Sequence, residues 1–276
     1  MLAIVAKKKL SKQKVGEVID ILRGVYPGAT CELVHTNPFE LLTAVILSAQ
    51  TTDKRINMTT PALFAKYPTA EALAKADQAD VEGLIKSSGF YRAKAKAIIG
   101  MARALVERHG GQVPRTLEEL VELPGAARKT ANVVLGTAFR IATGFVVDTH
   151  VQRLSQLIGF TDHNDVKHIE RDMMTIVPQD DWVDFSHMLI LHGRRVCIAR
   201  KPMCDDCAIN KLCVSAFDPT VGYAAKGAIA DPGKKKVVIE TKQMRHERAL
   251  MKKAKRIANK VAEGEGRTAR KTTRPS

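Results

Sequence analysis

Apolar residues recur at helical spacing along most of this 276-residue chain, and the alternating pattern of a half-buried strand is almost absent. The run FELLTAVILSAQ at 39–50 is apolar nearly all round, which is typical of a helix that is buried on every side. The pattern predicts an all-α fold with short loops. Further helices are expected near residues 12–22, 59–66, 69–76, 80–87, 91–108, 116–123, 129–139, 149–158, 165–176 and 181–192.

Capping residues mark where several of these helices begin or end. Asn37 precedes a proline at the first helical position, and Ser11 stands at the start of the first helix. Thr116 and Glu119 have the spacing of a capping box. Gly89 suits a helix end, because glycine adopts the left-handed backbone of a C-cap without strain.

The positive charge of the chain is concentrated near its C-terminal end. The formal net charge is +15, and residues 221–276 hold 16 Lys and Arg against five Asp and Glu. Such an excess favours a polyanionic partner, nucleic acid before a membrane surface. Residues 218–276 are expected to be a mostly disordered basic tail, in which 243–262 can form a helix on a phosphate backbone. A solvated tail without a specific site is the alternative.

The composition argues against a membrane or secreted protein. No stretch approaches the roughly 18 uninterrupted apolar residues of a membrane-spanning helix. The first residues, MLAIVAKKKL, carry their charges after the apolar run, which is the reverse of a secretory signal. We therefore expect an intracellular protein, in the cytoplasm or nucleoid if its source is bacterial.

Four of the five cysteines lie within residues 197–213, in the pattern C-x6-C-x2-C-x5-C. In a reducing compartment this crowding indicates metal binding rather than disulfides. The spacing leaves a structural zinc ion and an iron–sulfur cluster both open. The fifth, Cys31, is expected to be an ordinary buried thiol. The four are Cys197, Cys204, Cys207 and Cys213.

The segment TLEELVELPGAARKTANVV at 116–134 predicts a helix, a tight turn and a second helix. Such a turn leaves backbone N–H groups free at the start of the second helix, and that end of a helix binds anions. In a basic protein the anion is expected to be a DNA phosphate. Arg128 and Lys129 lie in the first turn, where a cation gains nothing from the helix dipole. A lysine at this place therefore needs another explanation.

Asp148 stands between an apolar segment and a helix, where it is expected to act as an N-cap. The helix at 129–139 is about 16 Å long at about 1.5 Å per residue. The residues 140–148 that follow can span up to about 30 Å. The chain can therefore return along the helix, so that Asp148 lies beside Lys129, and capping is compatible with catalysis here.

Three motifs of this chain together resemble the endonuclease III family of helix-hairpin-helix DNA glycosylases. They are LPG-x2-RKTANVVL at 123–135, VDTH at 147–150 and LILHGR-x2-CIARKP-x-C-x2-C at 189–207. The resemblance covers nearly all of the chain outside the tail. It implies a two-lobed helical fold with a C-terminal four-cysteine loop. One lobe would be formed by 31–142 and the other by 1–30 together with 143–217.

The resemblance implies that Lys129 is a nucleophile that forms a Schiff base with the sugar of a damaged nucleotide. Asp148 would assist it and stabilise positive charge on the sugar. A free lysine has a pKa of about 10.4, so a neutral amine at neutral pH costs about 4 to 5 kcal/mol. The helix end supplies only about 0.3 to 1 kcal/mol. Partial burial of Lys129 is therefore expected to supply much of the rest.

The implied activity is the removal of oxidised pyrimidines from double-stranded DNA in base excision repair, followed by β-elimination at the abasic site. The implied cofactor is a [4Fe–4S] cluster on the four cysteines, and a monomer is expected. Gln50 would fill the gap left by the extruded nucleotide, and Phe90 would act as a wedge, unless it packs inward as a cap. Further DNA contacts are expected at Gly125, Ala127, Arg128, Thr130, His150, Arg153, Arg200 and Lys201.

The hairpin departs from the family pattern at Ala127, because relatives usually carry Gly-x-Gly where this chain has Gly125, Ala126 and Ala127. If the position needs a left-handed backbone, alanine costs about 1 to 2 kcal/mol. If it needs a close approach to a phosphate, the added methyl group pushes the backbone away. Either effect would weaken DNA binding without touching the chemistry, and the basic tail can compensate.

Three other classes of protein are rivals of this interpretation, and Lys129 together with the short basic tail argues against the first of them. An adenine-mismatch glycosylase shares the fold and the cluster, but it lacks a lysine at the position of Lys129 and carries an additional C-terminal domain. An 8-oxoguanine glycosylase can have the lysine but lacks this cluster. A non-catalytic DNA-binding module would keep the cluster for structure alone. Borohydride trapping of a covalent adduct on abasic DNA distinguishes such a module from an enzyme.

Overall fold

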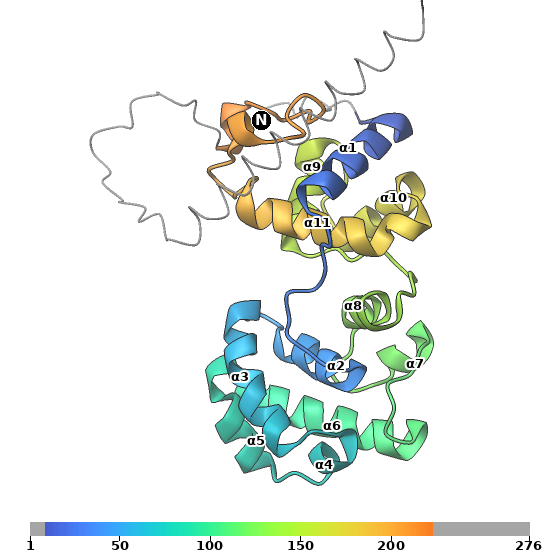
Figure 1. The fold of residues 1–276 in the computed structure, drawn as a ribbon, viewed down its shortest axis with the longest axis vertical. Coiled ribbons are helices and arrows are strands. Elements are labelled where there is room, and N and C mark those ends of the chain that lie inside the picture. Colours follow the sequence, from blue (N-terminus) through green and yellow to red (C-terminus); the bar gives the residue numbers. More distant parts are fainter. Residues whose placement is uncertain (1–8, 223–276) are drawn as a thin grey trace, which may run out of the picture. The chain divides into compact units, whose positions relative to one another are not determined.

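The computed structural model describes residues 9–222, which fold into α-helices joined by short turns and contain no β-strand (Figure 1). This confirms the all-α prediction. The α-helices are α1 (Lys12–Val25), α2 (Pro38–Leu47), α3 (Asp53–Lys66), α4 (Ala70–Ala74), α5 (Gln78–Ile85), α6 (Tyr91–His109), α7 (Leu117–Val121), α8 (Arg128–Phe139), α9 (Thr149–Ile158), α10 (Val166–Ile176) and α11 (Trp182–Arg195). Short 3-10 helices are η1 (Lys86–Ser88), η2 (Gln179–Asp181), η3 (Cys204–Asp206) and η4 (Pro219–Val221). No helix in this part of the chain is long and apolar enough to cross a membrane.

The chain divides into two compact units. Of the described residues, 9–29, 153–162 and 188–222 form unit 1, and 30–152 and 163–187 form unit 2. This division differs from the expected lobes, because 143–152 and 163–187 belong to the unit that holds the hairpin. The reason is tertiary packing: side chains of α10 and α11 within unit 2 contact α8 directly. The basic helix expected at 243–262 lies outside the described residues.

The capping residues identified in the sequence hold their helices as predicted. Asn37 Oδ1 accepts a hydrogen bond from Glu40 N at 3.0 Å, and Ser11 and Thr116 cap α1 and α7. The start of α3 was predicted too late: the helix begins at Asp53 rather than near 59, with Thr52 as its cap. Its first turn is mostly polar, so the apolar spacing gave no sign of it.

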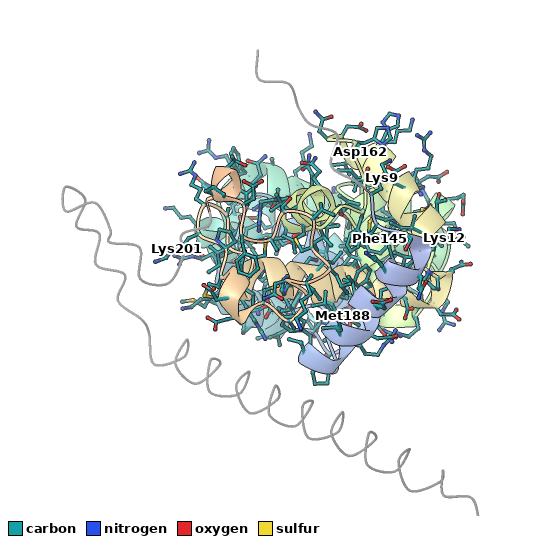
Figure 2. All side chains as sticks on the ribbon, turned by 90° about the horizontal axis from the view of Figure 1, so that it is seen from above. Lys9, Lys12, Phe145, Asp162, Met188 and Lys201 are labelled. Atoms are coloured by element: carbon teal, nitrogen blue, oxygen red, sulfur yellow. The ribbon has the colours of Figure 1, made fainter. Side chains whose placement is uncertain are left out.

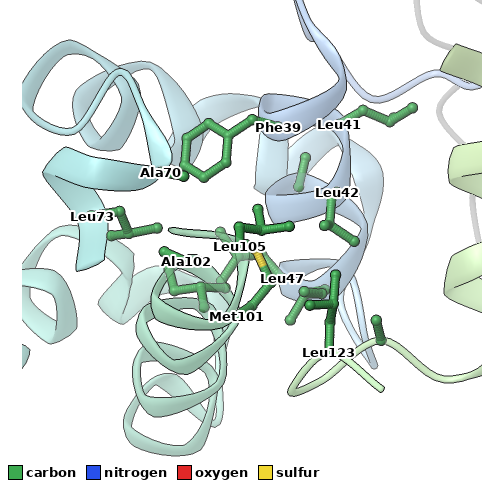
Figure 3. Close-up of a cluster of buried hydrophobic side chains, with 14 of the residues drawn as sticks. Phe39, Leu41, Leu42, Leu47, Ala70, Leu73, Met101, Ala102, Leu105 and Leu123 are labelled. Carbon is green, nitrogen blue, oxygen red and sulfur yellow. The ribbon is translucent and has the colours of Figure 1, made fainter. Parts of the chain in front are cut away.

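Helix α2 lies in the core of unit 2, as its apolar composition predicts. Helix α6 packs against α2, α4 and α5. Figure 3 shows side chains from α2, α4 and α6 meeting in one apolar cluster. The labelled members are Phe39, Leu41, Leu42, Leu47, Ala70, Leu73, Met101, Ala102, Leu105 and Leu123, all of them buried. This cluster forms a rigid support on which the hairpin of α7 and α8 is built.

Helix α8 approaches its neighbours closely at two glycines. A Cβ at Gly125, in the turn before α8, would lie 3.0 Å from Ile46 Cγ2 and 3.1 Å from Ala97 Cβ. Gly125 also has φ of +80°, which only glycine adopts without strain. A Cβ at Gly136, within α8, would lie 2.8 Å from Val183 Cγ2. The helix is therefore fixed against α2 and α6 at its start and against α11 near its end.

Unit 1 has its own apolar interior, to which α1 contributes Val15, Val18, Ile19 and Leu22. The backbone N–H of Leu10 donates to Gly159 O at 2.9 Å. Lys9 Nζ lies 3.2 Å from Asp162 Oδ2, and Figure 2 shows this exposed pair. The segment before α1 is therefore attached to the turn that follows α9.

Gly136→Ala is expected to destabilise the protein by about 1 to 3 kcal/mol, because the new methyl group must displace Val183 or α8 itself. Urea unfolding followed by circular dichroism measures the change. Gly83→Ala is the matched control, since Gly83 also lies in a helix and a Cβ there meets no atom within 4 Å. Adding Val183→Ala should recover part of the loss; fully additive losses would contradict this account.

Candidate functional site

The hairpin expected from the sequence is present and is formed by α7, a tight turn and α8. Leu123 N donates to Leu120 O at 3.2 Å, and Ala126 N donates to Leu123 O at 3.0 Å. The first hydrogen bond of α8 runs from Ala131 N to Ala127 O. The backbone N–H groups of Arg128, Lys129 and Thr130 find no acceptor among the described residues. Three donors therefore remain available at the positive end of α8 for an anion.

The backbone of Ala127 resolves the question that the sequence raised. Ala127 has φ of −72° and ψ of 166°, an extended conformation that alanine adopts without strain, and the residue is exposed. The left-handed residue of the turn is Gly125 instead. Of the two effects considered for Ala127, backbone strain is therefore excluded. The other effect remains, namely that the methyl group holds a phosphate away from the anion-binding end of α8.

Lys129 is exposed, whereas the sequence analysis expected it to be partly buried. That expectation is wrong for the protein alone. The side chain lies in the first turn of α8 beside the free N–H groups, and the residues around the turn leave it open to solvent. Any desolvation of its amine must therefore come from whatever covers this face.

Asp148 caps α9, as predicted. Its Oδ1 accepts hydrogen bonds from His150 N and Val151 N, both at 2.8 Å, and its backbone carbonyl accepts from Gln152 N at 2.8 Å. Within residues 9–222 its second carboxylate oxygen, Oδ2, accepts no hydrogen bond. The side chain is half-buried. One oxygen therefore fixes the carboxylate, and the other remains available to a ligand.

A polar network that the sequence did not reveal connects α8 with α10 and with the loop before Asp148. Arg128 Nη2 and Nε donate to Glu170 Oε1 at 2.9 and 3.1 Å. Asn132 Nδ2 donates to the same oxygen at 3.3 Å, and Thr143 Oγ1 donates to Asn132 Oδ1 at 2.9 Å. Arg128, predicted as a DNA contact, is therefore held by a carboxylate in the free protein.

The loop between α8 and Asp148 packs tightly on this network. A Cβ at Gly144 would lie 2.4 Å from Asn132 Nδ2 and 2.5 Å from Glu170 Oε1, so no larger residue fits without movement. The next residue, Phe145, is buried against Phe185, with ring centroids 6.1 Å apart in an edge-on arrangement. Both contacts fix the course of the chain shortly before Asp148.

Two further residues singled out in the sequence, Gln50 and Phe90, are exposed and have left-handed backbones. Their φ angles are 56° and 47°, which are strained for residues with a side chain. The Phe90 side chain is 70% exposed, which excludes the alternative that it packs inward. Both side chains are therefore presented to solvent at some conformational cost.

The four C-terminal cysteines belong to unit 1 and line one cavity of about 30 Å³. Arg153 Nη1 lies 3.6 Å from Cys197 Sγ, and His192 Nε2 lies 3.5 Å from Cys207 Sγ. His192 is buried, and its Nδ1 lies 3.1 Å from the hydroxyl group of Tyr26. The sequence-predicted ligands are therefore gathered together, and Cys31, half-buried in unit 2, is separate from them.

Burial controls the protonation of the groups around this cavity. It raises the pKa of Cys207 to about 12 and raises that of Cys197, although Arg153 opposes the second shift. Burial, aided by Arg153, lowers the pKa of His192 to about 4, so its ring is neutral near pH 7. A metal centre that binds thiolates must therefore displace protons from these cysteines. Sulfur donors of this number fit zinc or an iron–sulfur centre.

The model of the HhH-GPD superfamily base excision DNA repair proteins matches residues 43–179. The endonuclease III of a Synechocystis species is 53% identical over 216 residues, which cover 78% of this chain and 99% of the relative. That of Escherichia coli is 45% identical over 204 residues, covering 74% of this chain and 96% of the relative. The chain belongs to the endonuclease III family. It is accordingly a DNA glycosylase and AP lyase of base excision repair.

Solved structures agree with this assignment to the endonuclease III family. A trapped covalent intermediate of an endonuclease III with DNA is 41% identical, has a TM-score of 0.72, and covers 76% of this chain and 99% of its own. A non-covalent endonuclease III–DNA complex matches equally well. A thermostable thymine-DNA glycosylase, 24% identical with a TM-score of 0.67 over 74% of this chain and 97% of its own, shares the fold.

Among the DNA contacts expected for an endonuclease III, Arg153 is half-buried, and its Nη2 donates to Gly193 O at 3.3 Å while Nη1 faces Cys197. Its guanidinium group therefore borders the cysteine cavity, and its contact with DNA stays a prediction. Arg200 and Lys201 are exposed, and Figure 2 labels Lys201 on the cysteine loop.

Gly144→Ala is expected to slow base excision by about tenfold or more, because a displaced loop moves Asp148, which the sequence predicts to assist the reaction, and small displacements of catalytic groups are costly. Single-turnover excision kinetics measure the change. Binding to undamaged duplex DNA should be nearly unchanged, since the hairpin donors are untouched. An excision rate equal to that of the wild type would show that the contact with Asn132 and Glu170 does not position Asp148.

Proposed function

We propose that this chain excises oxidised pyrimidines from duplex DNA and then cleaves the strand, with Lys129 as the nucleophile. The observation that supports this most is the position of Lys129, an exposed amine directly beside three unpaired N–H donors at the start of α8. A phosphate bound by those donors would place the neighbouring sugar near the amine. The substrate is double-stranded DNA that contains oxidised bases or abasic sites, so in a bacterial cell the place of action would be the nucleoid.

The proposed reaction begins with attack of the Lys129 amine on the sugar carbon that carries the base. The carbon–nitrogen bond to the base breaks, and its electrons leave with the base, which takes up a proton. The bond between the same carbon and the ring oxygen then breaks, the oxygen takes up a proton, and the amine nitrogen loses its protons, so that an open-chain sugar is joined to Lys129 as a Schiff base. Loss of a sugar proton from the Schiff base then expels the adjacent phosphate by β-elimination. Asp148 is proposed to stabilise positive charge on the sugar through Oδ2, since Oδ1 is occupied by the cap.

Because Lys129 is exposed, the desolvation of its amine has to be supplied by the substrate. An ammonium group surrounded by water is stabilised in its charged form, and a nucleophilic amine must be neutral. The described residues around the turn do not remove that water. We therefore propose that bound DNA covers the amine and supplies the missing desolvation.

The extruded nucleotide leaves a gap in the duplex that must be filled. Gln50 and Phe90 are proposed to fill the gap and to separate the flanking bases, because both are exposed and both are held in strained conformations. Hairpin contacts from Gly125, Ala127 and Thr130 would hold the phosphate. The methyl group of Ala127 is expected to limit how closely that phosphate approaches.

The four cysteines are proposed to hold a [4Fe–4S] cluster, whose contribution when bound is to fix the C-terminal loop. The four thiols line one cavity of unit 1, and the endonuclease III family is the one for which this C-x6-C-x2-C-x5-C spacing implies such a cluster. With the loop fixed, Arg200 and Lys201 would present their charges to DNA phosphates.

Lys129→Gln is expected to abolish borohydride trapping on abasic DNA, because glutamine retains the length of the side chain but cannot form a Schiff base. Gel electrophoresis of the reduced complex measures the adduct. Binding to undamaged DNA should change by less than about threefold, since the backbone donors remain.

Two variants make this test specific. Lys96→Gln removes another exposed lysine of unit 2 and should trap normally. Asp148→Asn keeps an N-capping side chain, so it should fold normally, excise bases about a hundredfold more slowly, and still be trapped. Undiminished trapping by Lys129→Gln would refute the assignment of the nucleophile.

Cys204→Ser is expected to remove the broad visible absorption of an iron–sulfur protein and to lower the urea midpoint, because Cys204 is a buried member of the set. Absorption spectroscopy and iron analysis of the purified protein measure the loss. Cys31→Ser is the matched control and should leave colour and iron content unchanged. If the wild-type protein is colourless and contains one zinc ion per chain, the proposal of an iron–sulfur cluster is wrong and the four cysteines bind a single zinc ion.

A further inference from the structure

Lys94 is a lysine that is almost completely buried, with a relative exposure of 6%, in the first turn of α6. Its Nζ donates to Thr51 Oγ1 at 2.9 Å and to Ser88 O at 2.8 Å. The Thr51 hydroxyl group in turn donates to the same carbonyl oxygen of Ser88. These three groups form a closed hydrogen-bonded triangle inside unit 2.

The surroundings of Lys94 are unusual for a buried lysine. Within the described part of the chain no carboxylate pairs with it, and both of its acceptors are neutral. Burial accordingly lowers the pKa of Lys94, because the charged form is poorly solvated there. An apolar residue of similar length would fill this space at a smaller electrostatic cost. The triangle therefore does more than fill the interior.

The triangle joins two loops that are distant in the sequence. Thr51 directly follows Gln50, and Ser88 stands two residues before Phe90. Gln50 and Phe90 are both exposed, and their φ angles, 56° and 47°, lie in the left-handed region, as do those of three other exposed non-glycine residues among those described. Strained conformations persist only where the surrounding structure holds them. Lys94 makes a direct hydrogen bond to the chain close to each of them.

We propose that Lys94 is a positioning residue that locks the Gln50 loop and the Phe90 loop into one rigid element, so that both side chains enter the duplex together. The inference rests on the proposed roles of Gln50 and Phe90. Without the ammonium group, the two loops would sample conformations in which only one side chain is ready for insertion. The competent fraction of the protein would fall, and base extrusion would slow in proportion.

The test variant is Lys94→Met, which keeps an unbranched side chain of similar length and removes all donors. Ser87→Ala is the matched control, because Ser87 lies in the same turn and shares a 2.8 Å hydrogen bond with Thr59 Oγ1, away from the Gln50 loop. Thr51→Val removes the second corner of the triangle and carries the test by itself if Lys94→Met fails to fold. Thermal unfolding establishes that each variant is folded.

Two single-turnover reactions are compared at saturating enzyme. One substrate is a duplex with a thymine glycol paired with adenine, which must be extruded, and the other is a duplex with a preformed abasic site. Lys94→Met and Thr51→Val are expected to slow release of the thymine glycol by about tenfold and strand cleavage at the abasic site by less than about twofold. The abasic site presents no base to unstack, so strand cleavage there does not depend on the insertion of Gln50 and Phe90 to the same extent. A variant that is merely destabilised would instead lose both activities equally.

The outcomes separate this inference from the proposed function. Wild-type protein that neither releases thymine glycol nor cleaves at the abasic site would refute the proposed function itself. Active wild type, together with Lys94→Met and Thr51→Val variants that slow both reactions equally or neither, would overturn the role of Lys94. The same selective loss in Ser87→Ala would also overturn it, because the effect would then belong to the turn as a whole.

Discussion

The close packing of α8 is the constraint on which the rest of the candidate site depends. The helix carries Lys129 and three unpaired N–H groups at one end, and these are useful only if that end is held still. Ile46 and Ala97 reach the turn at Gly125, and Val183 reaches the helix at Gly136. A glycine at each contact lets neighbouring elements approach to distances that a side chain would forbid. Lys129, the proposed nucleophile, is thereby tied to the apolar core of unit 2 rather than to a surface loop.

Much of this architecture can be read from the sequence, because the determining signals are local. The caps at Asn37, Thr116 and Asp148 each involve residues no more than four positions away. Glu170 left no such signal, since its partners Arg128 and Asn132 are 42 and 38 residues distant along the chain. The contact between Arg153 and Cys197 left no local signal either, since the two residues are 44 positions apart. The predicted burial of Lys129 was wrong, because the exposure of a side chain depends on all of its neighbours in the fold, including those distant along the chain.

Two lysines of unit 2 illustrate how differently one side chain can be used. Lys129 is exposed and follows a recognisable motif, so the sequence draws attention to it. Lys94 is buried in an ordinary helical pattern, and only its hydrogen bonds to Thr51 and Ser88 reveal that it does more than occupy space. As the proposed nucleophile, the first needs its water removed to react, and the second holds two loops through the two hydrogen bonds that it donates. Solvent exposure, more than residue type, separates chemistry from positioning in this chain.

The division of unit 1 into three sequence segments has a consequence for how the protein is made. Helix α1 is synthesised early, but its described partners in unit 1 come from residues 153–162 and 188–222. Until those segments leave the ribosome, the apolar side of α1 has no native surface to cover it. Unit 2 is also interrupted, yet all the buried residues of its apolar cluster precede residue 136. The hairpin core can therefore form first during translation, and unit 1 closes only when the cysteine loop has emerged, which leaves α1 a target for chaperones in the interval.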